Sequence, residues 1–116
     1  MTRSMQQPTF LILTALADRP QHGYGIMTDV ERMSDGSVRL RAGTLYAALD
    51  RLREEGFIQI DHEEIVDARL RRYYSLTDDG ATRLAAEADR LRRHAQTASR
   101  RLRASRITNA AARGVS

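Results

Sequence analysis

Apolar side chains recur at helical spacing in four segments of this chain, and turn-forming residues mark the limits of those segments. The first three predicted helices cover residues 8–18, 22–33 and 41–56. The fourth is much longer and runs from residue 78 to about residue 105. Residues 106–116 are short, rich in alanine and unanchored, so we expect a disordered tail there.

Between the third and fourth predicted helices the apolar period changes to two. Residues 58–60 and 70–76 alternate apolar with polar side chains, and Val66-Asp67-Ala68 between them suits a hairpin turn. A shorter alternation at residues 37–40 predicts a one-rung strand. Thr77 offers a hydroxyl N-cap to the last helix, which has two acids in its first turn.

The predicted order is helix, helix, small strand, helix, strand, strand and long helix. A helix-turn-helix followed by a two-stranded wing is typical of a winged helix-turn-helix, whose second motif helix enters the major groove of DNA. The expected fold class is mostly α (α+β). We expect a winged helix-turn-helix domain at residues 1–77, a C-terminal dimerisation helix at 78–105 and the tail at 106–116.

The third predicted helix has two unlike faces. Leu45, Leu49 and Leu52 recur at helical spacing and form the apolar face. The other face begins with small residues, Gly43 and Thr44, next to arginine. Such an end can approach DNA closely, because small residues do not hold the backbone away and helix N-terminal amides attract phosphate.

Composition narrows the class of protein. The chain has 116 residues, enough for one domain with an appended element, and no cysteine. Disulfides and thiolate metal sites are therefore excluded, and we expect a cytoplasmic, nucleoid-associated protein. No apolar run approaches the ~20 residues that span a bilayer, and the N-terminus lacks the pattern of a signal peptide, so no membrane partner is expected.

The charge is unevenly distributed. Residues 1–68 contain 7 Arg and 11 acids, a net −4, whereas residues 69–116 contain 12 Arg and 4 acids, a net +8. This asymmetry favours a polyanionic partner. All the basic residues are arginine. That usage suits bidentate phosphate recognition, but a GC-rich genome would produce it as well.

Three motifs stand out in the sequence: residues 20–26 (PQHGYGI), residues 40–52 (LRAGTLYAALDRL) and residues 71–80 (RRYYSLTDDG). Together they resemble the PadR family of bacterial transcriptional regulators, whose corresponding patterns are P-x-HGY-x-I, L-x-x-GTLY-x-AL-x-RL and RRYY-x-LT-x-x-G. The motifs keep the family's order and spacing. The resemblance implies a homodimeric winged-helix repressor of the short subfamily, one that often controls a neighbouring transporter or detoxification gene.

The sequence departs from this family at three places. Arg41-Ala42 replaces the common Ser-Pro before Gly43, which removes a good N-cap and adds a charge near the groove. The wing tip reads Asp67-Ala68-Arg69 instead of bearing Gly or Pro. Multidrug-binding members present an aromatic residue from the last helix, whereas residues 81–116 hold none.

The residues expected to contact DNA lie in the third helix, the segment before it, the wing and the start of the second helix. They are Tyr24, Arg39, Arg41, Gly43, Thr44, Tyr46, Ala47, Arg51, Arg69 and Arg71. The alternative is core packing for the two tyrosines and a solvated surface position for any arginine. Arg72 shares the strand face of Tyr74, so we interpret it as structural.

The last predicted helix carries an apolar seam. Its residues step by 4, 3, 4, 3 and 4, as in a coiled coil: Leu84, Ala88, Leu91, Ala95, Ala98 and Leu102. A helix of about 28 residues spans ~42 Å and is too long to pack only on its own domain. We therefore expect a homodimer. A small apolar effector would bind between the first helix and the seam, in a cleft lined by Phe10, Leu13, Ala88, Leu91 and Ala95.

The sequence pattern indicates neither a catalytic site nor a metal site. The three histidines, His22, His62 and His94, lie far apart without cysteine partners, and no catalytic constellation stands out, so we expect neither an enzyme, a metal nor a cofactor. The favoured hypothesis is a dimeric, sequence-specific repressor of double-stranded operator DNA that a small molecule relieves. The alternative is a non-specific DNA-binding or protein-docking adaptor that uses the Arg-rich C-terminal helix.

Overall fold

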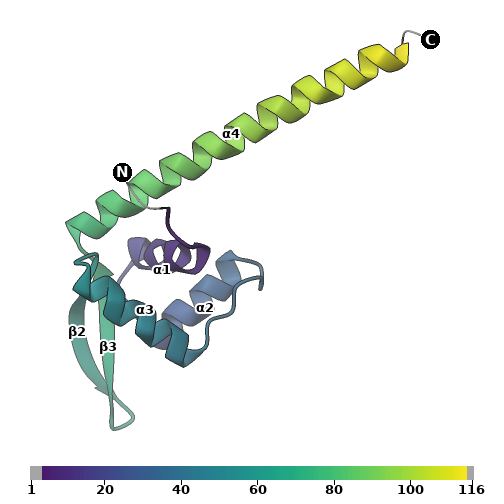
Figure 1. The fold of residues 1–116 in the computed structure, drawn as a ribbon. Helices are drawn as coiled ribbons and strands as arrows, with labels where there is room; N and C mark the ends of the chain where they lie inside the picture. Colours follow the sequence, from purple (N-terminus) through teal and green to yellow (C-terminus); the bar gives the residue numbers. More distant parts are fainter. Residues whose placement is uncertain (1–3, 115–116) are drawn as a thin grey trace. The chain divides into compact units, whose positions relative to one another are not determined.

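The computed structural model describes residues 4–114, and their side chains as far as residue 109. In these residues four helices and a small antiparallel sheet follow the predicted order (Figure 1). The elements are α1 (Gln7–Asp18), β1 (Gln21–His22), α2 (Gly23–Met33), α3 (Ala42–Glu54), β2 (Ile58–Val66), β3 (Arg69–Leu76) and α4 (Asp78–Gly114). The chain divides into two compact units, with the boundary between Ala85 and Ala86.

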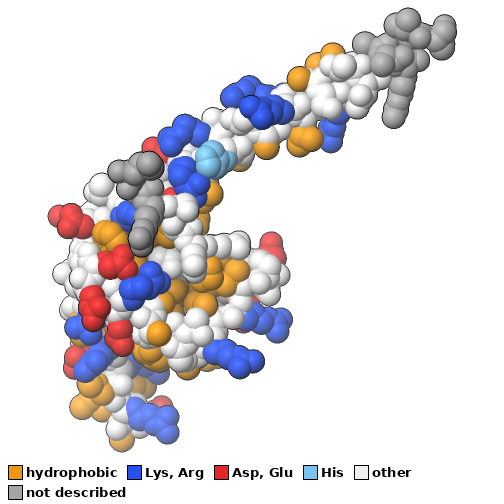
Figure 2. Space-filling view, viewed as in Figure 1, with side chains coloured by type: hydrophobic (Ala, Val, Ile, Leu, Met, Phe, Trp, Pro, Cys, Tyr) orange, Lys and Arg blue, Asp and Glu red, His pale blue; other side chains and the backbone are white. Residues whose placement is uncertain are grey.

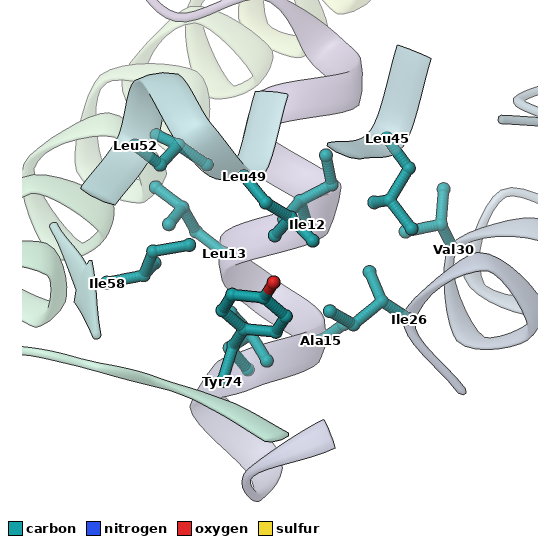
Figure 3. Packing of buried hydrophobic residues seen from close by; sticks show 11 residues of the cluster. Ile12, Leu13, Ala15, Ile26, Val30, Leu45, Leu49, Leu52, Ile58 and Tyr74 are labelled. Carbon is teal, nitrogen blue, oxygen red and sulfur yellow. The ribbon is translucent and has the colours of Figure 1, made fainter. Parts of the chain in front are cut away.

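One apolar core holds the first unit together (Figure 3). The helical spacing in α1 buries Ile12 and Leu13, and the apolar face of α3 buries its three leucines, as the sequence predicted. Tyr74 of β3 packs into the same cluster and is 4% exposed. The three helices with a two-stranded wing confirm the winged helix-turn-helix fold.

The sheet has the strand order β1-β3-β2, so β3 is central and β2 is an edge strand. The predicted hairpin is confirmed: Asp67 and Ala68 form its turn with φ values of 51° and 63°. The predicted strand at residues 37–40 is wrong, because that segment is irregular. The extra strand is Gln21–His22, which pairs with Tyr74 and Tyr73. A two-residue strand forms only because it pairs with a neighbouring strand, and no local sequence pattern predicts it.

A buried polar junction ties β1 to α1 and α2. The Gln21 amide nitrogen donates to the Ala15 carbonyl (2.9 Å) and to an Asp29 carboxylate oxygen (3.1 Å). Arg32 donates to the other Asp29 oxygen at 2.7 Å. Burial alone would raise the pKa of Asp29, but the hydrogen bonds from Gln21 and Arg32 outweigh burial and lower it.

Hydrogen bonds join the residues just before strand β2 to those just after strand β3. Gly56 ends α3 with a φ of 80°, as predicted, and its carbonyl accepts a hydrogen bond from the Thr77 hydroxyl (2.6 Å). The same Thr77 oxygen accepts from the Gly80 amide (3.0 Å), which confirms the predicted N-cap of α4. Gly80 is required by packing, because a β-carbon there would lie 2.9 Å from the Phe57 carbonyl carbon.

Helix α4 is longer than the sequence indicated. It continues to Gly114 instead of ending near Ser105, so the prediction of a disordered tail from residue 106 is wrong as far as the chain is described; residues 115 and 116 lie outside the described residues. Alanine has the highest helix propensity, and the Ala-rich segment has no Gly or Pro to stop the helix before its last residue. None of the helices in the described part of the chain is long and apolar enough to cross a membrane.

Candidate nucleic-acid interface

A groove of about 800 Å³ lies between the first turn of α2, the Tyr46–Asp50 side of α3 and the β2–β3 hairpin. We call it the wing groove. Its lining residues are His22, Gly23, Tyr24, Tyr46, Asp50, Val66, Asp67, Arg69, Leu70, Arg71, Arg72 and Tyr74. Figure 1 shows the β2–β3 hairpin projecting beyond the helices of the first unit.

The first turn of α3 is open to solvent. Arg41 is its N-cap residue and makes no side-chain capping bond, so the first-turn amides remain free for another acceptor. Gly43, Thr44 and Ala47 are exposed, and a β-carbon at Gly43 would meet nothing within 4 Å. Packing within the described part of the chain therefore does not require glycine at this position. The small residues leave this helix end free to approach a partner backbone.

Tyrosines form one side of the groove. Tyr46 is half-exposed, and its ring lies against the backbone of Gly23. Tyr24 is 73% exposed, so the core-packing alternative for it is wrong. Tyr74 is buried at the base of the groove. Burial, followed by the neighbouring Tyr46, raises its pKa and keeps its hydroxyl protonated as a donor.

The hairpin brings three arginines to the groove. Arg69 and Arg71 were predicted to contact DNA, and the structure places both in the lining. Arg72 lines it as well, half-exposed and 3.3 Å from the carboxylate of Glu63, its cross-strand partner, so a residue that we interpreted as structural also borders the groove. It does share a strand face with Tyr74, but the hairpin extends beyond the core, and there the same face borders the groove.

Several aromatic and acidic side chains of the sheet are engaged in contacts with one another. Tyr73 donates to Glu64 (2.5 Å) and stacks on His62, with ring centroids 4.3 Å apart. His22 approaches the other side of the Tyr73 ring at 5.3 Å. Burial lowers the pKa of His22, and the Arg71 guanidinium lowers it further against an opposite effect of Glu64. His22 is thereby favoured in its neutral form beside the groove.

Three predicted DNA-contacting arginines lie outside the groove lining: Arg39, Arg41 and Arg51. Arg39 precedes α3 and lies 3.3 Å from Glu31. Arg51 is two turns along α3, where it donates to the Thr9 hydroxyl (3.1 Å) and pairs with Glu55 (3.5 Å). It lines a second hollow of about 550 Å³ together with Thr9 and Phe57. The structure therefore separates Arg51 from the other candidates.

The predicted seam divides between the two units. Leu84 is partly buried against the core of the first unit, and its part in a dimer contact stays a prediction. In the second unit Leu91 is 39% and Leu102 is 58% exposed, and Ala95 and Ala98 are exposed as well. Figure 2 shows hydrophobic and arginine side chains along this helix. Its apolar seam from Ala88 onward is thus available to a partner.

The predicted effector cleft needs a correction. Leu13 is 0% exposed, because α1 directs it into the core, and so it cannot line an open cleft. Phe10 is half-buried, and its role stays a prediction. Among the residues whose side chains are described, no group of three His, Cys, Asp or Glu is arranged to hold a metal ion.

Comparison with known proteins places this architecture in a family. The family model described as "Transcriptional regulator PadR-like family" matches residues 12–86. An uncharacterized protein of Lysinibacillus sphaericus is 27% identical over 75 residues, which cover 65% of this chain and 69% of that protein.

Solved structures share the fold. A PadR family transcription regulator from Clostridium difficile is 24% identical with a TM-score of 0.68, over 84% of this chain and 99% of that one. A transcriptional regulator from Clostridium thermocellum is 22% identical with a TM-score of 0.68, over 79% of this chain and 89% of that one. Bacillus subtilis PadR in complex with operator DNA is 24% identical with a TM-score of 0.62, over 70% of this chain and 47% of that one. Since the family model covers more than half of the sequence, this protein belongs to the PadR-like family of transcriptional regulators.

Proposed function

We propose that this protein is a dimeric, sequence-specific DNA-binding repressor whose operator affinity responds to a small molecule. The wing groove and the exposed start of α3 carry the proposal. Tyr24 and Tyr46 lie on one side of the groove and a hairpin with three arginines on the other, and α3 begins with the exposed small residues Gly43 and Thr44. The family assignment supports a role in transcription, and the Bacillus subtilis relative was solved on operator DNA. Such a repressor would work on the nucleoid in the cytoplasm.

In this proposal α3 enters the major groove by its first turns. Gly43, Thr44 and Ala47 would lie against base edges, where their small side chains allow close contact. Arg41 and the free first-turn amides would bind the adjacent phosphates. Arg69 and Arg71 of the hairpin would bind phosphates on the far side of the wing groove.

Two copies would pair through the apolar seam of α4. A dimer fixes the distance between two recognition helices and lets them read a palindromic operator. Ala95 and Ala98 in the seam allow the two helices to approach closely. A small apolar effector that entered beside Ala88, Leu91 and Ala95 would change that distance. A preference of ~3 kcal/mol for one spacing would lower operator affinity about 150-fold.

The decisive experiment compares operator with random DNA. A gel shift on the DNA upstream of the protein's own gene first identifies a bound fragment. Thr44→Ala and Tyr46→Phe should then weaken binding to that fragment more than to random DNA. Arg69→Ala and Arg71→Ala should weaken both equally, and each should reduce the salt slope by ~0.9. Equal losses for all four variants on both DNAs would refute base reading by α3.

A second candidate function rests on the charge of α4. Residues 90–109 contain seven arginines and no acid. If the protein is monomeric and binds all DNA alike, an adaptor that docks through this helix becomes the better account. Sedimentation of the wild-type protein separates the two functions, because the repressor requires a dimer.

A further inference from the structure

The tip of the hairpin carries two large aliphatic side chains that nothing in the described part of the first unit covers. Ile65 is 77% exposed and Leu70 is 58% exposed. They are direct cross-strand partners, one pair away from the turn, so they share one face of the sheet. Neither belongs to the core cluster or packs against it. The pair is therefore an isolated apolar patch at the far end of the wing.

The tip is narrow and flanked by Arg69 and Arg72, with the acidic Asp67 in its turn. Asp67 and Ala68 reverse the chain in a two-residue turn, so only two strands, about 4.8 Å apart, reach the end of the wing. Arg69 precedes Leu70 and Arg72 follows two residues later, and all three line the wing groove. Figure 2 shows hydrophobic and arginine side chains together at the lower end of the molecule, over the hairpin tip.

The partner of such a tip must combine apolar walls with flanking negative charge. The minor groove of DNA fits, because its walls are deoxyribose, its edges are phosphate and its width of about 6 Å admits single side chains. Proteins that enter this groove commonly insert Leu or Ile. A second copy of the chain fits poorly, because two such tips would bring their arginines against each other.

We propose that Ile65 and Leu70 enter the minor groove beside each operator half-site and pack on its sugar walls, while Arg69 and Arg72 hold the two flanking phosphate rows. This inference rests on the proposed function. It adds an apolar, salt-insensitive contact to the phosphate contacts of the wing. It also predicts a preference for flanking DNA whose minor groove accepts an aliphatic side chain.

The test uses the full-length protein and the operator fragment that the wild type binds. The double variant Ile65→Thr/Leu70→Thr has a strand-favouring β-branched residue at both positions while removing most of the aliphatic surface. We expect operator affinity at least about tenfold weaker with an unchanged salt slope, because apolar contacts release no counterions. Arg69→Ala/Arg72→Ala should instead lower the slope by ~0.9 for each phosphate that the variant no longer neutralises.

A matched control is available on α4. Ile107 is 70% exposed, close to the value for Ile65, and lies off the apolar seam. Ile107→Thr should leave operator affinity unchanged, which shows that loss of an exposed isoleucine is harmless in itself. A double wing variant that binds as well as the wild type, or loses affinity through a smaller salt slope, refutes the inference.

A measurement on the wild type keeps the inference falsifiable if the double variant folds poorly. Hydroxyl-radical footprinting should show protected sugars across the minor groove next to each half-site. Netropsin bound at that flank should weaken the wild type to the level of the double variant. Unprotected sugars, or no effect of netropsin, overturn the inference. A wild type that binds no upstream DNA would instead refute the proposed function, so the two failures are distinguishable.

Discussion

The Tyr46 ring lies directly against the backbone of Gly23. A β-carbon built at Gly23 would come within 2.8 Å of the Tyr46 ring carbon that bears the hydroxyl. The contact joins the first turn of α2 to the second turn of α3, and these are the two helices of the helix-turn-helix. Two of the sequence motifs therefore meet in space: the glycine of the first makes room for the tyrosine of the second.

Gly23→Ala should displace the Tyr46 side chain, because protein interiors tolerate little overpacking. We expect a loss of about 1–3 kcal/mol in the free energy of unfolding and a clear loss of operator affinity. Urea denaturation and a gel shift measure the two effects. In a Tyr46→Ala background the same change should cost much less stability. Additive costs would show that the two residues do not constrain each other.

Gly43→Ala should separate folding from binding. A β-carbon there meets only open space, and alanine favours helix over glycine, so stability should rise by up to about 0.5–1 kcal/mol. Operator affinity should nevertheless fall, since the added methyl group would hold the helix end away from DNA. Thermal unfolding and fluorescence anisotropy measure the two effects. A variant that binds the operator as tightly as the wild type would place the DNA elsewhere.

The hydrogen bonds of Thr77 and the close packing of Gly80 predict that substitutions at these two residues lower the free energy of unfolding by different amounts. Thr77→Ala removes the N-cap of α4 and the bond to the Gly56 carbonyl, and should cost about 1–2 kcal/mol. Thr77→Ser keeps the hydroxyl and serves as the control. Gly80→Ala should cost more than Thr77→Ala, because its β-carbon meets the Phe57 backbone, which cannot move aside cheaply. Denaturant unfolding at one pH ranks the three variants.

Leu91→Arg should break the proposed dimer. The substitution places a charge in the apolar seam, which is unfavourable where the partner helix excludes water. Analytical ultracentrifugation at micromolar concentration should show monomers. Ile107→Arg adds the same charge to an exposed position off the seam and should remain dimeric. If both variants sediment as dimers, the interface lies outside the α4 seam.

Asp29 should make the free energy of unfolding depend on pH. Its pKa in the folded protein is lowered, so its carboxylate stabilises the fold above the ordinary aspartate pKa. That contribution is lost as the pH falls below about 4, the ordinary pKa of aspartate, and then through the lowered pKa of Asp29 in the folded protein. Asp29→Asn should therefore be less stable at neutral pH and lose less stability on acidification, as urea denaturation at several pH values would measure. Asp18→Asn, at an exposed position, is the control for changing any aspartate of the first unit.

The elements with their own local signals were predictable from the sequence. Helical spacing fixed the apolar faces of α1 and α3, because one face of a helix must leave water whatever it packs against. Thr77 and Gly56 marked helix ends for reasons of local hydrogen bonding and backbone freedom. The two-residue period predicted the hairpin, and the small residues around Gly43 indicated the side of α3 that stays open.

Only the tertiary structure decided the features that depend on a distant partner. Strand β1 exists because Gln21–His22 lies beside β3, and two residues carry no period of their own. Arg72 borders the wing groove because the hairpin extends beyond the core. The alternation of apolar and polar residues does not show how far the hairpin extends. The need for glycine at Gly23 and Gly80 likewise comes from Tyr46 and Phe57. Local patterns determine which face of an element is apolar, and packing determines where that face stops being covered.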